Sequence, residues 1–323
     1  WASGQGWGLV SWQIYAPVIA AAKLMGLDTD GIVKALGAAY YQVIITADKH
    51  IGGNQVGASD IYHYAHGFCN RNGICAAQMA ELGFDGMTDS LDGPNGLWAK
   101  VSDRVDWSWH DRELGSRYLI LETLYKRWPA NMWIQGPLDA LDALCREHDL
   151  GPDQVDRITS VVVSPTIPMI MENSIGRYDG VLDAQFHLPY CFAAYLLDRE
   201  PGQHWFDEDH RRDPAIRKLA ERVTSTGESL TPIEAFEIFW TGSFPLVSVT
   251  LTLDDRTFTH TLRYPKGHPR NPFTWDETEQ LFRHTVRDVL DTNAADRVID
   301  LVKHLDGQQN LHELAGLLAN PAS

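Results

Sequence analysis

Four polar rings stand close together near residue 64, and their types suit proton transfer. The stretch 59–84 reads SDIYHYAHGFCNRNGICAAQMAELGF, which places Tyr62, His63, Tyr64 and His66 ahead of a segment with helical periodicity. Histidine has a reference pKa of about 6.5, so an imidazole can serve as acid or base near neutrality. His63 and His66 are therefore candidate catalytic residues. A hydrogen-bonded structural histidine ahead of a buried helix is the alternative that this pattern leaves open.

Three helices are predicted in this first part of the chain. The segment that follows the rings has helical spacing over 72–82, and 12–25 is apolar all round, as in a helix buried in a bundle. A further helix, over 31–46, follows Asp28 and Asp30, which stand where an N-cap belongs. Its many alanines and glycines predict close packing between helices.

The pattern changes from helical to alternating and β-branched after residue 151. DRITSVVVSP predicts a strand over 157–163, and FPLVSVTLTLDDRTFTHTLRY predicts a hairpin that turns at Asp254 and Asp255. Two helices are expected between these strands, near 183–198 and 213–222. Strands are thus expected only in the middle of the chain.

The order of helical, mixed and helical segments predicts an α+β multidomain fold. We expect a large all-α domain formed by residues 1–130 and 268–323, with a smaller α+β domain, residues 131–267, inserted as a lid. The helical return begins at TWDETEQLF, where Thr274 precedes Glu277 by the three residues of a capping box.

Composition narrows the class of protein. With 323 residues and 44% hydrophobic content, the chain is long enough to bury a sizeable core. The net charge of −16 argues against nucleic acid as a partner, and no apolar run reaches the roughly 20 residues of a membrane span. The four cysteines lack both CxxC and zinc spacing, and no secretory signal opens the chain. We expect a cytoplasmic protein without a membrane partner.

Motifs for cofactors and metals are missing from the sequence. It has no GxGxxG after a strand, no P-loop, no HExxH and no GxSxG, so no metal and no organic cofactor is expected. The chain opens WASGQGWG, without a methionine. From this we expect that an N-terminal part is absent, cleaved, or supplied by a second chain.

Five segments in the same order resemble the MmgE/PrpD family. They are ALGAAYYQ, HGFCNRNGICAAQMAELGFDG, KRWPANMWIQGPLDALDAL, LDAQFHLPYCFAAYLL and GHPRNPFTWDETEQLF, and the resemblance runs from about Trp7 to Leu318. The family contains 2-methylcitrate dehydratase, cis-aconitate decarboxylase and iminodisuccinate epimerase. The resemblance implies a cofactor-free helical domain with an α+β lid, usually in a dimer. Its chemistry is proton removal next to a carboxylate of a small acid, followed by loss of water or carbon dioxide, or by reprotonation.

The residues at the family's first catalytic motif differ in this chain. Where the family usually has a lysine and, three residues later, a histidine, an ungapped match places Tyr62 and Ala65. His63 and His66 each lie one position further on, so a small shift would present imidazoles to the same cavity. The candidates for substrate binding in this part of the chain are Lys49, His50, Tyr62 and Arg71.

The second and third motifs also differ. Before its AIDAL helix the family has a cysteine and then a histidine, where this chain has Asn131 and Gln135, which bind by hydrogen bonds but take no proton at neutral pH. The family's QFSLPY is QFHLPY here, so Tyr190 matches the pocket tyrosine and His187 replaces a serine. Tyr190 is the third catalytic candidate, and a packed core tyrosine is its alternative. Asn131, Gln135 and His187 are candidates for substrate binding.

Two function classes follow. The first is a cofactor-independent hydro-lyase acting on a small carboxylic acid, with decarboxylation and epimerisation as other outcomes, in a homodimer whose His63 or His66 faces Tyr190 across the two domains. The second is a non-catalytic homologue or partner subunit of an active enzyme. Converging His and Tyr side chains would favour the enzyme, whereas a pocket filled by tryptophan would favour the second class.

Overall fold

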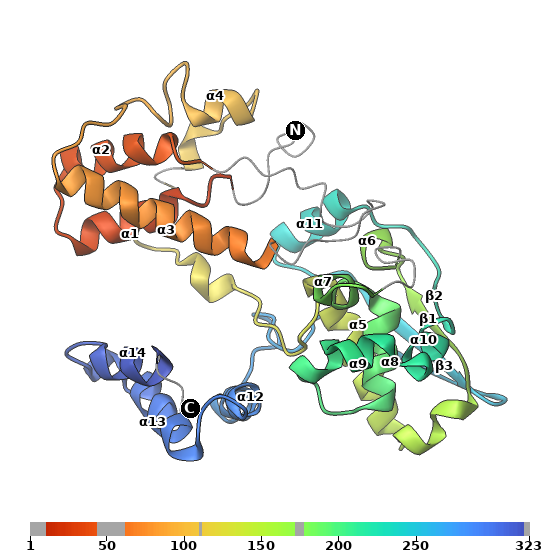
Figure 1. Cartoon of the computed structure of the whole chain (residues 1–323). Coiled ribbons are helices and arrows are strands. Elements are labelled where there is room, and N and C mark those ends of the chain that lie inside the picture. The colour runs from red at the N-terminus through yellow and green to blue at the C-terminus, as the bar shows by residue number, and fades with distance from the viewer. Residues whose placement is uncertain (1–10, 44–61, 110–111, 172–177, 320–323) are drawn as a thin grey trace. The chain divides into compact units, whose positions relative to one another are not determined.

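The structure is a computed structural model that describes residues 11–43, 62–109, 112–171 and 178–319 (Figure 1). In helix α3 the backbone of residues 62, 63 and 65 is described without the side chains. The chain divides into two compact units, residues 1–118 with 172–186 and residues 119–171 with 187–323.

The first unit is helical throughout its described part. Its elements are α1 (Tyr15–Leu24), α2 (Thr29–Tyr40), α3 (Tyr62–Glu81), α4 (Leu97–Val101), the 3₁₀ turn Trp107–Trp109 and α7 (Val181–Gln185). Helices α1, α2 and α3 pack on one another around small buried residues such as Ala22, Ala35 and Ala77. Alanine-rich faces allow this close approach, as the sequence predicted for the second helix.

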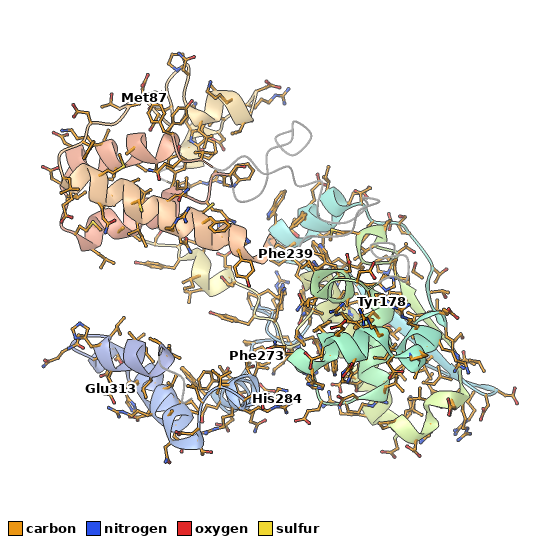
Figure 2. All side chains as sticks on the ribbon, in the orientation of Figure 1. Met87, Tyr178, Phe239, Phe273, His284 and Glu313 are labelled. Atoms are coloured by element: carbon orange, nitrogen blue, oxygen red, sulfur yellow. The ribbon has the colours of Figure 1, made fainter. Side chains whose placement is uncertain are left out.

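Helix α2 begins and packs as its sequence predicts. Asp28 is the N-cap, and its carboxylate accepts a hydrogen bond of 2.9 Å from the N–H of Gly31. A Cβ added at Gly37 would lie 2.3 Å from the backbone nitrogen of Met87, so only glycine fits where the 86–87 backbone approaches α2. Met87 is labelled in Figure 2. The helix ends at Tyr40, short of the expected residue 46, and residues 44–61 lie outside the described part of the chain.

Helix α3 corrects the predicted boundary. It runs unbroken from Tyr62 to Glu81, whereas the sequence placed the helix start at residue 72. Gly67 and Gly73 each cost about 1 kcal/mol of helix propensity relative to alanine, so local propensity does not favour this part of α3. Packing outweighs this cost, since a Cβ at Gly73 would lie 2.7 Å from Pro17 of α1. Glycine is what lets α1 and α3 come together.

The second unit mixes helices with one sheet. Its helices are α5 (Met132–Glu147), α6 (Pro168–Met171), α8 (Leu188–Leu197), α9 (Glu208–Arg212), α10 (Pro214–Ala220), α11 (Pro232–Trp240), α12 (Trp275–Val286), α13 (Thr292–Lys303) and α14 (His312–Ala319). Its 3₁₀ turns are Leu119–Glu122, Pro152–Arg157, Gln203–Phe206 and Leu305–Gly307. Its strands are β1 (Ile158–Ser164), β2 (Val223–Ser225), β3 (Val247–Leu253) and β4 (Arg256–Leu262).

The four strands form one mixed sheet in the order β2-β1-β3-β4. β1 pairs with β2 in parallel and with β3 antiparallel, and β3 and β4 form the predicted hairpin, whose turn holds Asp254 at φ 51°. The strands expected at 157–163 and at the start of the hairpin thus belong to one sheet. Every second residue of β3 is buried, which fixes the face that packs against α5.

Helix α5 carries the core of the second unit. Ile134, Leu138 and Leu141 are fully buried, and the helix packs on β3, β4 and α8. Burying each of these side chains stabilises the fold by about 1.5–3 kcal/mol. Because α5 is held this firmly, its polar residues have fixed positions.

Helices α12 to α14 complete the second unit. Thr274 Oγ1 accepts from the N–H of Glu277 at 3.2 Å, and the Glu277 carboxylate accepts from the N–H of Thr274 at 2.7 Å, which confirms the predicted capping box. By its contacts this segment groups with the sheet-bearing unit. The proposal that it shares a helical domain with residues 1–130, with 131–267 as a lid, stays a prediction. Within the described residues no helix has the length and apolar character to cross a membrane.

Candidate functional site

His66 is a catalytic candidate whose side chain the structure describes. It is exposed on α3, and its Nδ1 lies 2.6 Å from Oε1 of Gln13. An amide oxygen only accepts hydrogen bonds, so Nδ1 of His66 is the donor in this pair. Lys49 and His50 lie outside the described residues, as do the side chains of Tyr62 and His63.

Arg71 is exposed on the same helix. Its Nη2 and Nε lie 3.2 and 3.3 Å from Oδ1 of Asn72, and its guanidinium carbon lies 5.5 Å from the ring centre of Phe68. Binding of a substrate carboxylate by Arg71 stays a prediction.

Gln135 holds the loop that leads into α5. Its Oε1 accepts from the backbone N–H groups of Arg127 and Trp128 at 3.0 and 2.9 Å. Its Nε2 donates to the carbonyls of Trp128, Ala130 and Asn131 at 3.0, 3.2 and 3.3 Å. The side chain is fully buried, and both ends of its amide are occupied by the loop backbone. In this arrangement Gln135 positions residues 127–131.

Asn131 caps α5. Its Oδ1 accepts from the N–H of Trp133 at 2.9 Å, the usual contact of an N-cap residue. Trp133 is buried against Phe236, Phe239 and Phe244. The loop 127–131 is therefore fixed at both ends, and substrate binding by Asn131 or Gln135 stays a prediction that requires these contacts to exchange.

Asp139 ties the same loop to a second one. Its Oδ1 accepts from Arg127 Nη1 and from the indole N–H of Trp128, both at 2.9 Å. Its Oδ2 accepts from the backbone N–H of Lys266 at 2.5 Å. Burial raises the pKa of Asp139, and the Lys266 N–H and Arg127 oppose that shift. Lys126, which precedes Arg127, keeps an exposed surface, while neighbouring atoms partly desolvate its ammonium group and lower its pKa.

Asp142 lies one turn further along α5 and gathers two guanidinium groups. Arg127 Nη1 donates to its Oδ2 at 2.8 Å, Arg146 donates to the same oxygen, and the hydroxyl of Tyr195 donates to Oδ1 at 2.8 Å. Because Arg127 and Arg146 share one oxygen, their charges are close neighbours. The buried carboxylate holds them there.

Tyr190 and His187 sit at the start of α8. Tyr190 is fully buried and its hydroxyl donates to the carbonyl of Trp205. His187 caps the helix: Nδ1 accepts from the N–H of Tyr190 at 3.3 Å and Nε2 donates to the carbonyl of Met171 at 3.1 Å. Burial lowers the pKa of His187 to about 4, which keeps the ring neutral at physiological pH. A catalytic Tyr190 and a substrate-binding His187 stay predictions.

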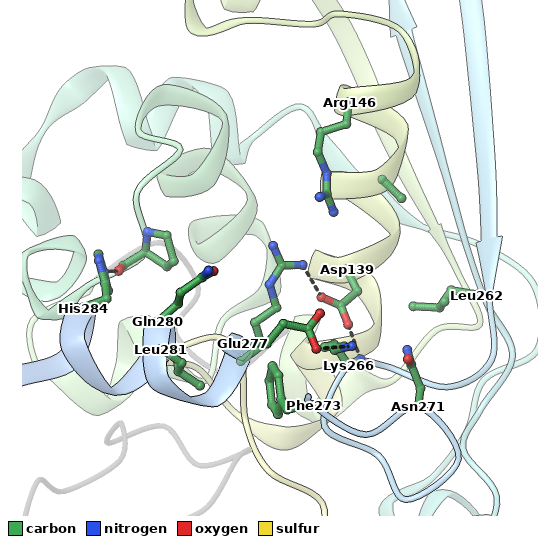
Figure 3. Close-up of a pocket in the computed structure, with 13 residues that line it drawn as sticks. Asp139, Arg146, Leu262, Lys266, Asn271, Phe273, Glu277, Gln280, Leu281 and His284 are labelled. Atoms are coloured by element: carbon green, nitrogen blue, oxygen red, sulfur yellow. Dashed lines mark hydrogen bonds and ion pairs between the residues drawn. The ribbon is translucent and has the colours of Figure 1, made fainter. Parts of the chain in front are cut away.

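A cavity of about 510 Å³ lies between α5, the 262–273 segment and α12 (Figure 3). It is lined by Arg127, Asp139, Ala143, Arg146, Pro201, Leu262, Lys266, Asn271, Phe273, Glu277, Gln280, Leu281 and His284. In the close-up, Lys266 and Glu277 point toward one another, and their ammonium and carboxylate groups lie 2.7 Å apart. That ion pair and a hydrogen bond from the N–H of Thr274 lower the pKa of Glu277 to about 2.

Sequence reasoning missed the charged residues around this cavity. A signal was present, since PLDALDAL places Asp139 and Asp142 three residues apart on the apolar face of a helix. Buried carboxylates are rarely found without cationic partners, and Lys126 and Arg127 stand just upstream. The partner in Lys266 could not be read from the sequence, because it comes from a segment far along the chain. In the part of the chain that the structure describes, no group of three His, Cys, Asp or Glu side chains could hold a metal ion.

Comparison with known proteins covers most of the chain. Residues 2–110 match the MmgE/PrpD N-terminal domain and residues 128–307 match the MmgE/PrpD C-terminal domain. Cis-aconitate decarboxylase of Homo sapiens is 26% identical over 319 residues, which cover 94% of this chain and 60% of that protein. The enzyme of the same name from Aspergillus terreus is 23% identical over 325 residues, 95% of this chain and 63% of that protein.

The chain thus spans about 60% of the length of the curated relatives that it resembles. The two matched domains follow one another along the chain, in the order of their N- and C-terminal names, and the longer one covers more than half of the 323 residues. The chain belongs to the MmgE/PrpD family.

Proposed function

We propose that this chain is a lyase acting on a small carboxylic acid, with decarboxylation as its leading reaction. The observation that carries the proposal is the match to both domains of the family, together with relatives named cis-aconitate decarboxylase. Dehydration, the reaction favoured from the sequence, and epimerisation are the other outcomes of the same chemistry. The proposal includes a homodimer and no cofactor.

Decarboxylation and dehydration of such an acid each need only one or two side chains that transfer a proton. In decarboxylation the bond between a carbon and its carboxylate breaks, carbon dioxide leaves, and the electron pair passes into the conjugated carboxylate that remains. A general acid then protonates the carbon. In dehydration a base removes the proton next to a carboxylate and an acid protonates the departing hydroxyl. An imidazole near neutrality serves either role. His66 supports the proposal, since it is exposed with Nδ1 held by Gln13.

The test is a screen of small di- and tricarboxylic acids in deuterium oxide. Proton NMR would follow loss of substrate and deuterium in the product, and released carbon dioxide would separate decarboxylation from dehydration. Cis-aconitate and 2-methylcitrate are the first compounds. On any substrate found, His66→Ala and His63→Ala are compared with Tyr190→Phe, and replacing the true proton carrier should lower kcat by about 10²- to 10⁴-fold. Wild-type turnover in all three variants would remove these residues from the mechanism.

A second candidate function has an observation of its own. Four residues at the family's motif positions have fold contacts: Gln135 and Asn131 hold a loop and a helix end, and His187 and Tyr190 bond backbone carbonyls. Trp128 packs beside them against Trp205. These contacts favour a non-catalytic homologue that assembles with an active family member. A chain inert in the screen that changes the turnover of a co-expressed active member would support this reading.

A further inference from the structure

The cavity between α5 and α12 gathers cationic side chains in an acidic protein. The whole chain carries a net charge of −16, yet Arg127, Arg146 and Lys266 all line this one concave surface. Phe273 and Leu262 form apolar parts of the wall. A hollow with a few convergent polar groups and apolar walls is the usual form of a small-molecule site.

The guanidinium groups of Arg127 and Arg146 each have N–H donors that are not used in their ion pairs. Within the described residues, Arg127 makes both of its ion pairs through Nη1, and Arg146 makes its pair through Nη2. Each guanidinium has five N–H donors in a planar fork that matches a carboxylate, so each retains further N–H groups for a ligand. Asp142 accepts a hydrogen bond from each of the two arginines, which positions both guanidinium groups and occupies only one nitrogen of each.

Two carboxylates of the protein already line the cavity: Asp139, which pairs with Arg127, and Glu277. Glu277 reaches in from α12, and its Oε2 lies 2.7 Å from Lys266 Nζ. This side chain shows which chemical group the Lys266 corner accepts. Gln280, one turn along α12, is exposed and also lines the cavity, so its amide adds a neutral polar group.

We propose that this cavity is a binding site for a small di- or tricarboxylate, held by Arg127 and Arg146 with Lys266 as a third cation. The volume of about 510 Å³ admits such a molecule. This goes beyond the proposed function, because binding is expected whether or not the chain turns over a substrate. The ligand is either a reacting acid or an effector of the same chemistry.

Two substitutions should act in opposite directions on the binding of propane-1,2,3-tricarboxylate, measured by titration calorimetry on the full chain. Arg146→Gln removes one cation and should weaken binding about tenfold, the scale of one charge-assisted hydrogen bond. Glu277→Gln removes the internal carboxylate that competes for Lys266 and should tighten binding by about threefold to tenfold. Glutamine also serves in a capping box, so α12 keeps its start.

Arg212→Gln is the matched control. Arg212 and Arg146 are both exposed arginines paired with a carboxylate four residues earlier on a helix, and Arg212 does not line the cavity. Its loss should leave binding unchanged. Equal effects of the Arg146 and Arg212 substitutions, or a Glu277→Gln variant that binds no tighter, would overturn the proposal. Sulfate bound as tightly as the tricarboxylate would overturn its carboxylate class.

Kinetic measurements on the same variants distinguish a reacting acid from an effector as the ligand of the cavity. For a reacting acid, Arg146→Gln raises KM by the factor found in calorimetry. For an effector, KM stays the same while the influence of the tricarboxylate on turnover disappears. A chain that binds the tricarboxylate with this variant pattern but turns over no acid would refute the proposed lyase and leave the cavity assignment standing. A chain that turns over an acid but does not show this pattern of variant effects in calorimetry would refute the cavity assignment and leave the proposed lyase standing.

Discussion

Replacing His187 by serine should remove a large part of the acid sensitivity of the second unit. His187 is buried and neutral, with a pKa lowered to about 4 from the usual 6.5. When the pH falls from 7 to 5, the unfolded chain takes up a proton at this residue and the folded chain does not. The free energy of unfolding therefore decreases as the pH drops, over the window from about 6.5 to about 4.

The size of the effect follows from those two pKa values. Between pH 7 and pH 5 the linkage amounts to about 2 kcal/mol, and it saturates near 3 kcal/mol below pH 4. His187→Ser keeps a capping oxygen for α8 but loses the hydrogen bond to Met171 and leaves a void. The variant should be less stable at pH 7 by roughly 1–3 kcal/mol, yet lose about 2 kcal/mol less than wild type on going to pH 5.

Urea unfolding at the two pH values measures this double difference. Tryptophan fluorescence and far-UV circular dichroism should give coincident transitions before a two-state free energy is assigned. His312→Ser is the control, because His312 is exposed on α14, and its pH dependence should match wild type within about 0.5 kcal/mol. A double difference below about 0.5 kcal/mol for His187→Ser would refute the reasoning that burial keeps this ring neutral.

Two further predictions test the loops around the cavity by unfolding experiments. Gly267→Ala should cost roughly 3 kcal/mol or more, because a Cβ there would lie 2.0 Å from the carbonyl oxygen of Tyr125, whereas Gly83→Ala, at a similar φ with open space around it, should cost only about 1–2 kcal/mol. An equal loss of unfolding free energy in the two variants would show that the cost comes from backbone strain at positive φ and not from the close approach of the two loops. Gln135→Leu should cost roughly 2–4 kcal/mol because it leaves the loop backbone without its partners, while Gln280→Leu, on an exposed surface, should stay within about 0.5 kcal/mol. A small loss for Gln135→Leu would mean that the loop finds other hydrogen bonds.

Local signals predicted the parts of the fold that local forces decide. The alternation over β1, the turn at Asp254 and the capping box at Thr274 each depend on neighbouring residues, and each was found where the sequence placed it. The start of α3 was misplaced because helical periodicity is clear only from residue 72 onward, whereas α3 begins at Tyr62 and packs against α1. Tertiary contacts of this kind cannot be read from spacing.

The polar residues at the motif positions also make tertiary contacts that the sequence does not predict, and these contacts affect their possible functions. Residue type alone allowed Asn131, Gln135 and His187 to bind a substrate, but in the fold each one satisfies backbone groups of a loop or helix end. None of the three carries an ionisable group that is charged at neutral pH, since the first two are amides and burial keeps the third neutral. In the proposed lyase, proton transfer would therefore fall to groups elsewhere, and among the described candidates His66 is the one with an exposed imidazole. The two proposed functions therefore give different results on α3: if His66 or His63 carries the proton in a lyase, alanine there lowers turnover, whereas a partner subunit tolerates alanine at both positions without loss of its effect on an active family member.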